Sequence, residues 1–306
     1  MQKKPLLTVI CPVFNEQDCI ELFYDRLKQV SRDLEPEMDC NLLFMNNCST
    51  DSTLQKIKNL SAKDSTVYYA TLASNVGYQR SIEKGIRIAK GDLFVIVDVD
   101  CEDPPEMFKD FYQKIKTGYD LVYGLRADRE ESWSLILIRK LFYRLTKSVS
   151  DEKFILDMAE FCMFTSEVRD ALVQDSTSFP FIRASIGRIG YSTFGIPYKR
   201  HKRIAGKTNY NFYRMFTFAI AGILSSSTLP LRLTAYFLPI YFLACAVAFG
   251  FYNSGYFPGF FGFFQILTGI YLCTAISFIS IYIARIHKNS LGRPNAFVAN
   301  KHSRLP

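Results

Sequence analysis

The sequence predicts a mostly parallel α/β domain followed by a pair of membrane-spanning helices. Short apolar runs alternate with helical periods over roughly the first 120 residues, and residues 233–284 contain no charged side chain. All 29 Asp and Glu lie at or before Asp175, whereas residues 176–306 contain 14 Lys and Arg. Because the basic half also contains the longest uncharged run, the chain is neither a disordered polymer nor a uniformly basic nucleic-acid-binding protein.

Five apolar runs have the length of buried strands, and the stretches between them have the period of amphipathic helices. Alternation of this kind predicts a parallel sheet with helices on both faces, and ligands bind beyond the carboxyl ends of such strands. The expected strands are Leu6 to Val13, Asn41 to Met45, Val67 to Leu72, Leu93 to Val97 and Asp120 to Tyr123. The expected helical periods are Ile20 to Val30, Leu54 to Leu60, Ile82 to Ala89 and Met107 to Ile115.

The loops after these strands are rich in acids and amides. They contain no Gly-x-Gly-x-x-Gly and no Gly-Lys-Ser/Thr, which argues against a dinucleotide fold or a P-loop. The fourth strand ends in Asp98-Val-Asp100-Cys-Glu102, and alternation points the two aspartates to the same side. Carboxylates suit Mg²⁺ or Mn²⁺, and the cation can hold a diphosphate. The alternative is an ordinary acidic turn that faces water.

The uncharged run of 52 residues is long enough for two membrane crossings. We expect spans at about 233–252 and 260–284, with turn-forming residues between them. Lys and Arg flank the pair on both outer sides and are absent from the turn, so the positive-inside rule places both termini in the cytoplasm. The alternative is a pair of core helices in a large soluble protein.

The expected organisation is a cytoplasmic domain over 1–207, an interfacial amphipathic helix over 208–230, a transmembrane hairpin over 231–285 and a cytoplasmic basic tail over 286–306. The amino-terminal apolar run, Leu6 to Phe14, is too short for a secretory signal. The eight cysteines form no C-x-x-C pair, so we expect free thiols in a reducing compartment.

A series of motifs resembles, in order, the family 2 glycosyltransferases. Later features resemble the polyprenyl-phosphate members of that family, which include bactoprenol glucosyltransferases and dolichol-phosphate mannose synthases. The family motifs are Pro12-x-x-Asn15-Glu16, Ser49-Thr50-Asp51, Asn75-x-Gly77, Asp98-x-Asp100 with Asp103-Pro104-Pro105-Glu106, and Arg200-x-x-Arg203-x-Ala205-Gly206. The later features are Pro230-Leu231-Arg232, Ile283-Ala284-Arg285-Ile286 and Arg293-Pro294.

The resemblance implies a GT-A-type fold and inverting transfer of a sugar from a nucleotide-diphosphate sugar to a polyprenyl phosphate. A UDP-sugar and undecaprenyl phosphate are the favoured substrates, with Mg²⁺ or Mn²⁺ as cofactor. The reaction would take place at the cytoplasmic face of the inner membrane, for modification of a cell-surface glycan. Expected partners are a second copy of the chain, a flippase and a downstream glycosyltransferase, with no role for nucleic acid.

The resemblance also implies residue roles. Three of them have plain alternatives: Glu16 as a helix-dipole charge, the two arginines near residue 200 as an anionic-lipid patch, and Arg129 as a solvated loop residue. The implied donor site is Pro12, Asn15, Glu16, Asn46, Asn47, Asp98, Arg200, Arg203 and Lys207. The implied metal ligands are Asp100, Asp98 and Glu102, the acceptor-phosphate residues are Arg126 and Arg129, and the catalytic residues are Asp100, Glu160 and Asp157.

Three departures from the family pattern point to altered specificity or to a weakened enzyme. They are Asn46-Asn47-Cys48 for Asp-Asp-Gly, Asn209 for Lys, and Ala159-Glu160-Phe161-Cys162 for Gly-Asp-Phe-Arg. The competing hypothesis is therefore a catalytically silent, membrane-anchored adaptor that binds nucleotide or lipid. A processive polysaccharide synthase would share the early motifs but resembles proteins with a Gln-x-x-Arg-Trp string, and the only Trp here is Trp133, outside any such string.

Overall fold

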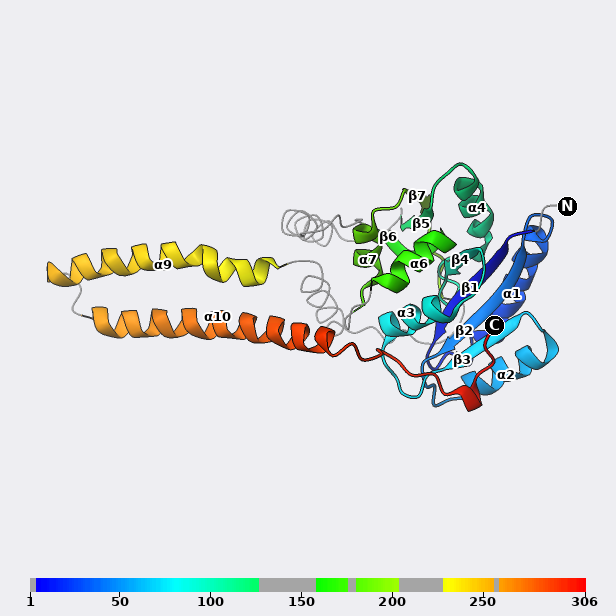
Figure 1. Cartoon of the computed structure of the whole chain (residues 1–306), viewed down its shortest axis with the longest axis horizontal. Coiled ribbons are helices and arrows are strands. Elements are labelled where there is room, and N and C mark those ends of the chain that lie inside the picture. The colour runs from blue at the N-terminus through cyan, green and yellow to red at the C-terminus, as the bar shows by residue number, and fades with distance from the viewer. Residues whose placement is uncertain (1–3, 127–157, 176–179, 204–227, 256–258) are drawn as a thin grey trace.

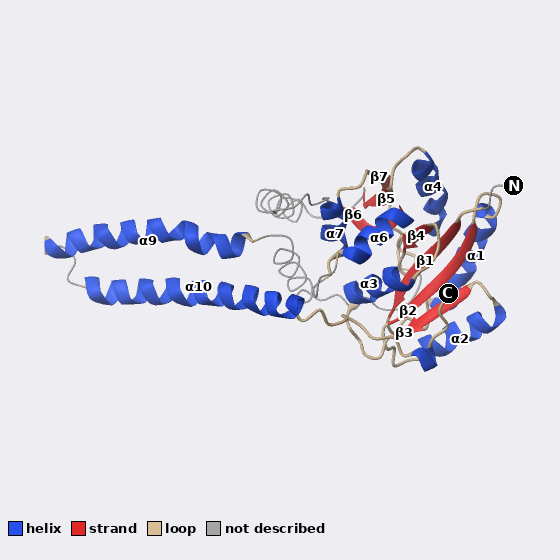
Figure 2. Cartoon of the chain, viewed as in Figure 1, coloured by secondary structure: helices blue, strands red, loops and turns tan. Residues whose placement is uncertain are grey.

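The fold is a mixed seven-stranded sheet with helices on both faces, from which two long helices extend (Figures 1 and 2). The computed structural model describes residues 4–126, 158–175, 180–203, 228–255 and 259–306. The strand order is β3-β2-β1-β4-β6-β5-β7. The strands are β1 (Leu6–Val13), β2 (Asp39–Asn46), β3 (Val67–Thr71), β4 (Leu93–Ile96), β5 (Leu121–Arg126), β6 (Met158–Thr165) and β7 (Thr193–Tyr198).

Among the described strands, β6 alone is antiparallel to its neighbours, β4 and β5. The other neighbouring pairs are parallel, so their carboxyl ends meet at one edge of the sheet. Because β6 runs the opposite way, its first residues, Met158 to Glu160, lie at that same edge. This edge is where ligands bind in open α/β sheets.

Two layers of helices cover the sheet. Helices α1 (Ile20–Leu34), α2 (Thr53–Lys63) and α4 (Phe108–Lys116, preceded by the short η1, Pro105–Met107) pack on one face. Helices α3 (Tyr78–Ile88), α6 (Ser166–Gln174) and α7 (Ile182–Ile189) pack on the other. Neighbouring strand residues point to opposite faces, so Val9 and Cys11 join the first core while Ile10 joins the second.

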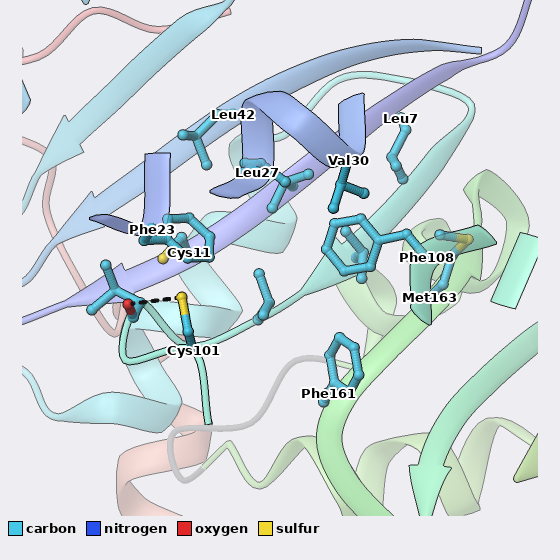
Figure 3. Packing of buried hydrophobic residues seen from close by; sticks show 14 of the residues in the cluster. Leu7, Cys11, Phe23, Leu27, Val30, Leu42, Cys101, Phe108, Phe161 and Met163 are labelled. Atoms are coloured by element: carbon cyan, nitrogen blue, oxygen red, sulfur yellow. Dashed lines mark hydrogen bonds between the residues drawn. The ribbon is translucent and has the colours of Figure 1, made fainter. Parts of the chain in front are cut away.

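The first core contains an aromatic cluster around Phe161; Figure 3 shows Phe161 and Phe108 in this core. The ring centroid of Phe161 lies 6.1 Å from that of Phe108, 4.8 Å from Phe111 and 5.8 Å from Tyr198. Offset and tilted aromatic pairs stabilise a core beyond the area they bury. Phe161 immediately follows Glu160, so this packing fixes the backbone that carries the Glu160 carboxylate.

The α/β class predicted from the sequence is confirmed. β1 has the predicted bounds, and the other four expected strands match to within a few residues. β5 continues three residues beyond the predicted end at Tyr123, which places Arg126 at the end of the strand. β6, β7, α6 and α7 were not predicted.

Two helices, α9 (Leu229–Asn253) and α10 (Phe260–Ser290), are long and apolar enough to cross a membrane. They lie side by side: the rings of Tyr241 and Tyr271 stack at 5.1 Å, and the Tyr241 hydroxyl is 2.7 Å from Thr268 Oγ1. They contain the expected spans 233–252 and 260–284. Of the expected interfacial helix, 208–227 lies outside the described residues, and 229–230 belong to α9.

Candidate active site

The candidate site is built from the loops after β1, β2 and β4, the first residues of β6, and the segment that follows β7. The first two loops are tied together. Asn15, with a left-handed φ of 54°, donates its backbone N–H to Ser49 Oγ at 3.0 Å, and its Oδ1 accepts the Thr50 N–H at 2.8 Å. The backbone N–H of Glu16 donates to Thr53 Oγ1 at 2.9 Å. The Ser-Thr motif at residues 49–50 therefore positions the loop that carries Asn15 and Glu16.

Asn46, the last residue of β2, and Asn47, which follows it, are buried, and both use their side-chain amides within the protein. Asn46 Oδ1 accepts the Ser49 N–H at 3.2 Å. Asn47 Nδ2 donates to Asn75 Oδ1 at 3.0 Å, and its Oδ1 accepts the Val76 N–H at 2.9 Å. Asn47 thus joins the loop after β2 to the loop after β3, whereas Asn46 stabilises the loop after β2. A direct donor contact by either residue stays a prediction.

Cys48 holds a φ of 59°, a conformation that costs a non-glycine residue free energy. We therefore expect Cys48→Gly to raise the free energy of unfolding by about 1 kcal/mol, because glycine adopts this backbone without a steric penalty. Chemical denaturation of the two proteins measures the change. Cys40→Gly, in the extended strand β2, is the matched control and should lower stability. A destabilised Cys48→Gly protein would contradict the strain.

The loop after β4 holds four acids, Asp98, Asp100, Glu102 and Asp103. Asp98 accepts a hydrogen bond from the Tyr78 hydroxyl at 2.8 Å. Asp100 is buried, and its Oδ1 accepts the Glu102 N–H at 3.1 Å. Burial, helped by the neighbouring Asp100 and Asp103 carboxylates, raises the pKa of Asp98 to about 8. In the part of the chain that the structure describes, no three His, Cys, Asp or Glu side chains converge as a metal site.

The raised pKa of Asp98 predicts a pH-dependent stability. Its folded-state pKa lies above the ordinary aspartate value of about 3.9, so the folded protein favours the protonated acid. Stability should therefore fall as the pH rises from about 4 through about 8. Asp98→Asn removes this loss, and we expect it to be more stable than wild type by at least about 1 kcal/mol at pH 9, without added divalent cation, and by less at pH 4. Equal pH dependence in both proteins would contradict the assignment.

Two arginines in the segment after β7 pair with acids of the loops after β1 and β4. Arg203 forms an ion pair with Glu16, and its Nη1 lies 3.6 Å from Asp100 Oδ2. Arg200 Nη2 lies 2.5 Å from Glu102 Oε2. The backbone N–H of His201, between the two arginines, donates to the Glu102 carbonyl at 2.8 Å. The structure thus gathers the predicted donor arginines and the predicted acids at one place.

Asp103 is a buried centre of this network that the sequence analysis did not assign. It accepts a hydrogen bond from the Tyr198 hydroxyl, and its oxygens lie 3.8 Å from Arg126 Nη2 and 3.7 Å from Arg200 Nε. Burial by itself lowers the pKa of Arg126, but Asp103 and Tyr198 outweigh it and raise that pKa. Arg126 therefore remains cationic at the edge of the site. The signal was its position, directly before the Pro-Pro pair that follows β4.

Glu160 is held by residues from two helices. Its Oε1 accepts from Gln79 Nε2 at 2.8 Å, and its Oε2 accepts from Arg183 Nη2 at 3.1 Å. Gln79 Oε1 also accepts the Ile182 N–H at 3.1 Å, so one side chain joins α3, β6 and α7. Both carboxylate oxygens of Glu160 therefore accept hydrogen bonds from side-chain donors. Gln79 and Arg183 were not predicted, because the sequence gives no sign that their helices meet β6.

The predicted site residues divide into three groups. Those that the structure brings to the site edge are Asn15, Glu16, Asp98, Asp100, Glu102, Arg126, Glu160, Arg200 and Arg203. Pro12 is buried in β1, and Asn46 and Asn47 are buried at the end of β2 and directly after it. Arg129, Asp157 and Lys207 lie outside the described residues, as do Asn209 and Trp133.

The protein is an α/β domain with acids and arginines at the carboxyl edge of its sheet, followed by two apolar helices. Comparison with known proteins identifies its family. The family model Glycosyl transferase family 2 matches residues 8–171. The chain belongs to this family and is a glycosyltransferase.

Relatives match beyond the family region. The chain is 30% identical over 230 residues to the uncharacterized glycosyltransferase YkcC of Bacillus subtilis, covering 75% of this chain and 71% of the relative. It is 28% identical to the bactoprenol glucosyl transferase of Shigella phage SfV, covering 96% and 98% of the two chains. A solved mannosyltransferase from Pyrobaculum calidifontis, in complex with GDP-Man and Mn²⁺, is similar at 17% identity and a TM-score of 0.49, with coverage of 90% and 87%.

Proposed function

We propose that this glycosyltransferase moves a sugar from a nucleotide-diphosphate sugar, a UDP-sugar in preference, onto a polyprenyl phosphate, undecaprenyl phosphate in preference. The observation that carries the proposal is the meeting of Arg200 and Arg203 with the acids after β1 and β4, in a domain joined to an apolar helix pair. The near full-length match to a protein named bactoprenol glucosyl transferase supports the acceptor, because that match includes both helices.

The arginines would bind the donor diphosphate by exchanging partners. Arginine suits this task because its planar fork makes paired hydrogen bonds to phosphate oxygens. In the structure, Arg200 pairs with Glu102, and Arg203 pairs with Glu16 and lies near Asp100. A bound diphosphate offers the same arginines an anion that also needs its charge neutralised, so donor binding would replace these ion pairs.

The acids after β4 suit a divalent cation by their chemistry. They are carboxylates, the ligands that Mg²⁺ and Mn²⁺ prefer, and Asp100 is paired with Arg203 only at 3.6 Å, so that contact is weak. Asp100 would hold the cation, with Asp98 or Glu102 as a second ligand. When bound, the cation supplies Lewis-acid neutralisation of the leaving diphosphate.

The acceptor phosphate would be received by Arg126, with Arg129 as a further candidate. A lipid phosphate is already ionised at neutral pH, so its oxygen can attack the anomeric carbon without a strong general base. The new carbon–oxygen bond forms on the face opposite the leaving group, and the bond to the diphosphate breaks, which inverts the anomeric centre. Glu160, with both oxygens bound, would orient the acceptor side of the site, and Asp157 remains a candidate for the same task.

The two helices support a membrane location for the enzyme. With α9 and α10 in the bilayer, the basic residues on the outer sides of the pair favour cytoplasmic termini and a cytoplasmic sheet domain at an inner membrane. The proposed boundaries are 1–207, 208–230, 231–285 and 286–306. Self-association, a flippase and a downstream glycosyltransferase are the proposed partners.

The test uses the full chain in detergent with undecaprenyl phosphate, Mn²⁺ or Mg²⁺ and a panel of UDP-, GDP- and dTDP-sugars. Release of nucleotide diphosphate is followed with and without the lipid. We expect release from one donor class that needs both lipid and cation. If no donor turns over although one binds with the cation, the adaptor hypothesis replaces the transferase.

A further inference from the structure

After α10 ends at Ser290, the chain returns to the sheet domain and runs along its outer edge (Figure 1). Two isolated antiparallel bridges join it to β3 and the residue after it, between Tyr69 and Arg304 and between Leu72 and Val298. The segment at residues 295–304, here called the C-terminal strap, therefore lies beside the edge strand of the seven-stranded sheet. The sequence predicted only a basic tail at this place.

The strap satisfies the outward-facing backbone of that edge. The amide N–H groups of Tyr69, Thr71 and Ala73 donate to Arg304 O, Ser303 Oγ and Phe297 O, each at 2.9 Å. In return, the Tyr69 and Thr71 carbonyls accept strap N–H groups at 2.8 Å each. An uncovered edge strand leaves such groups open to water and to other chains, so the strap completes the sheet.

Side chains fix the strap at both ends. Ala296, 3% exposed, is part of the core on the α3 side of the sheet. At the other end, Arg304 Nη1 donates to the Ser61 carbonyl and to Ser61 Oγ at 3.0 Å, and its guanidinium lies 5.6 Å from the ring centre of Tyr68. Contacts with a helix, a core and a strand indicate a defined docking site.

The strap contacts the chain directly after β3, at the start of the loop that leads to the candidate donor site. Ala73, which donates to Phe297 O, lies two residues before Asn75. Asn75 and Val76 form the hydrogen bonds to Asn47 that join this loop to the loop after β2. The hydrogen bond at Ala73 therefore fixes the start of the loop after β3, and this loop is hydrogen-bonded to the loop after β2.

We propose that the C-terminal strap is a built-in edge strand that positions the donor-site loops of this enzyme. Its amino end continues from α10, so it also fastens the carboxyl end of the helix pair to the β3 edge. The segment after β7 contacts the loops after β1 and β4 through the His201 N–H, Arg200 and Arg203. The role of the strap in donor binding rests on the proposed function.

The test compares Ala299→Pro, which removes the N–H that binds the Thr71 carbonyl, with Arg304→Ala, which removes the contacts to Ser61 and leaves the backbone intact. Lys301→Ala, at an exposed strap position, is the matched control. The first measurement is amide hydrogen exchange of the full chain. Exchange at Tyr69, Thr71 and Ala73 should accelerate at least about fivefold in both variants. Leu72, whose N–H binds Asn46 O inside the sheet, should remain protected and serves as the internal reference.

The second measurement is the affinity for UDP, with GDP as a second probe, in the presence of Mn²⁺. We expect several-fold weaker binding in both strap variants and none of this loss in the control. Unchanged exchange at Tyr69, Thr71 and Ala73 in both strap variants would show that the strap does not protect the β3 edge. Faster exchange with unchanged nucleotide affinity would show that the strap does not position the donor-site loops. If wild type binds no nucleotide while the exchange pattern follows the expectation, the donor site of the proposed function fails and the edge strand stands.

Discussion

Asp100→Ala is expected to abolish cation-dependent nucleotide binding and to lower sugar transfer at least about 1000-fold. Asp100 is the buried acid of the loop after β4, and its Oδ2 lies near Arg203, the arginine proposed for the diphosphate. Its removal takes away the proposed cation ligand and the weaker carboxylate contact of Arg203, whose ion pair with Glu16 remains. Calorimetric titration of nucleotide with and without Mn²⁺ measures the binding, and initial rates measure the transfer.

The control for this prediction is Asp110→Ala, an exposed acid in the first turn of α4 that lies outside the candidate site. It should bind nucleotide and turn over as wild type does. If Asp100→Ala kept cation-dependent binding at wild-type affinity, the acids after β4 would not be the cation site, whatever the rate of transfer.

Asp103→Ala is expected to lower the free energy of unfolding by about 3–5 kcal/mol. Asp103 is 2% exposed and faces Arg126, Arg200 and the Tyr198 hydroxyl, so its loss leaves a largely buried guanidinium without its counter-charge. Because Arg126 is the proposed acceptor-phosphate residue, the KM for the lipid should rise more than the KM for the nucleotide sugar. Denaturant titration of the full chain in detergent measures the stability.

Asp103→Asn separates charge from hydrogen bonding at the same position. The amide still accepts the hydrogen bond from Tyr198, so we expect a smaller loss of stability than in Asp103→Ala, with the rise in lipid KM retained. A loss below about 1 kcal/mol in Asp103→Ala would show that Asp103 does not neutralise Arg126 in the folded protein.

The sequence predicted the elements that are adjacent both in the chain and in the folded domain. β1 to β4 are each followed by a helix, and the apolar runs and helical periods are complete within each unit. β6 and β7 follow a different connection, in which an antiparallel strand enters between β4 and β5. Nothing in the local pattern of residues 158–198 specifies that insertion, so these strands were missed.

The candidate site divides in the same way. Asp98 and Asp100 could be predicted because they directly follow an apolar strand, and the motif order supplied Arg200 and Arg203. The partners of Glu160 could not, since Gln79 and Arg183 reach it from separate helices. The strap was missed for a similar reason: its binding depends on the open edge of β3, and a basic tail carries no period that reveals this.

The measurement that tests the central claim most directly is the chemical identity of the product made by the full chain from its donor, Mn²⁺ and undecaprenyl phosphate. Mass and nuclear magnetic resonance spectra of the extracted lipid should show one sugar on the lipid phosphate, with the anomeric configuration opposite to that of the donor. Asp100→Ala should make none. A product with retained configuration would contradict single displacement, and free sugar without a glycosylated lipid would contradict the proposed acceptor.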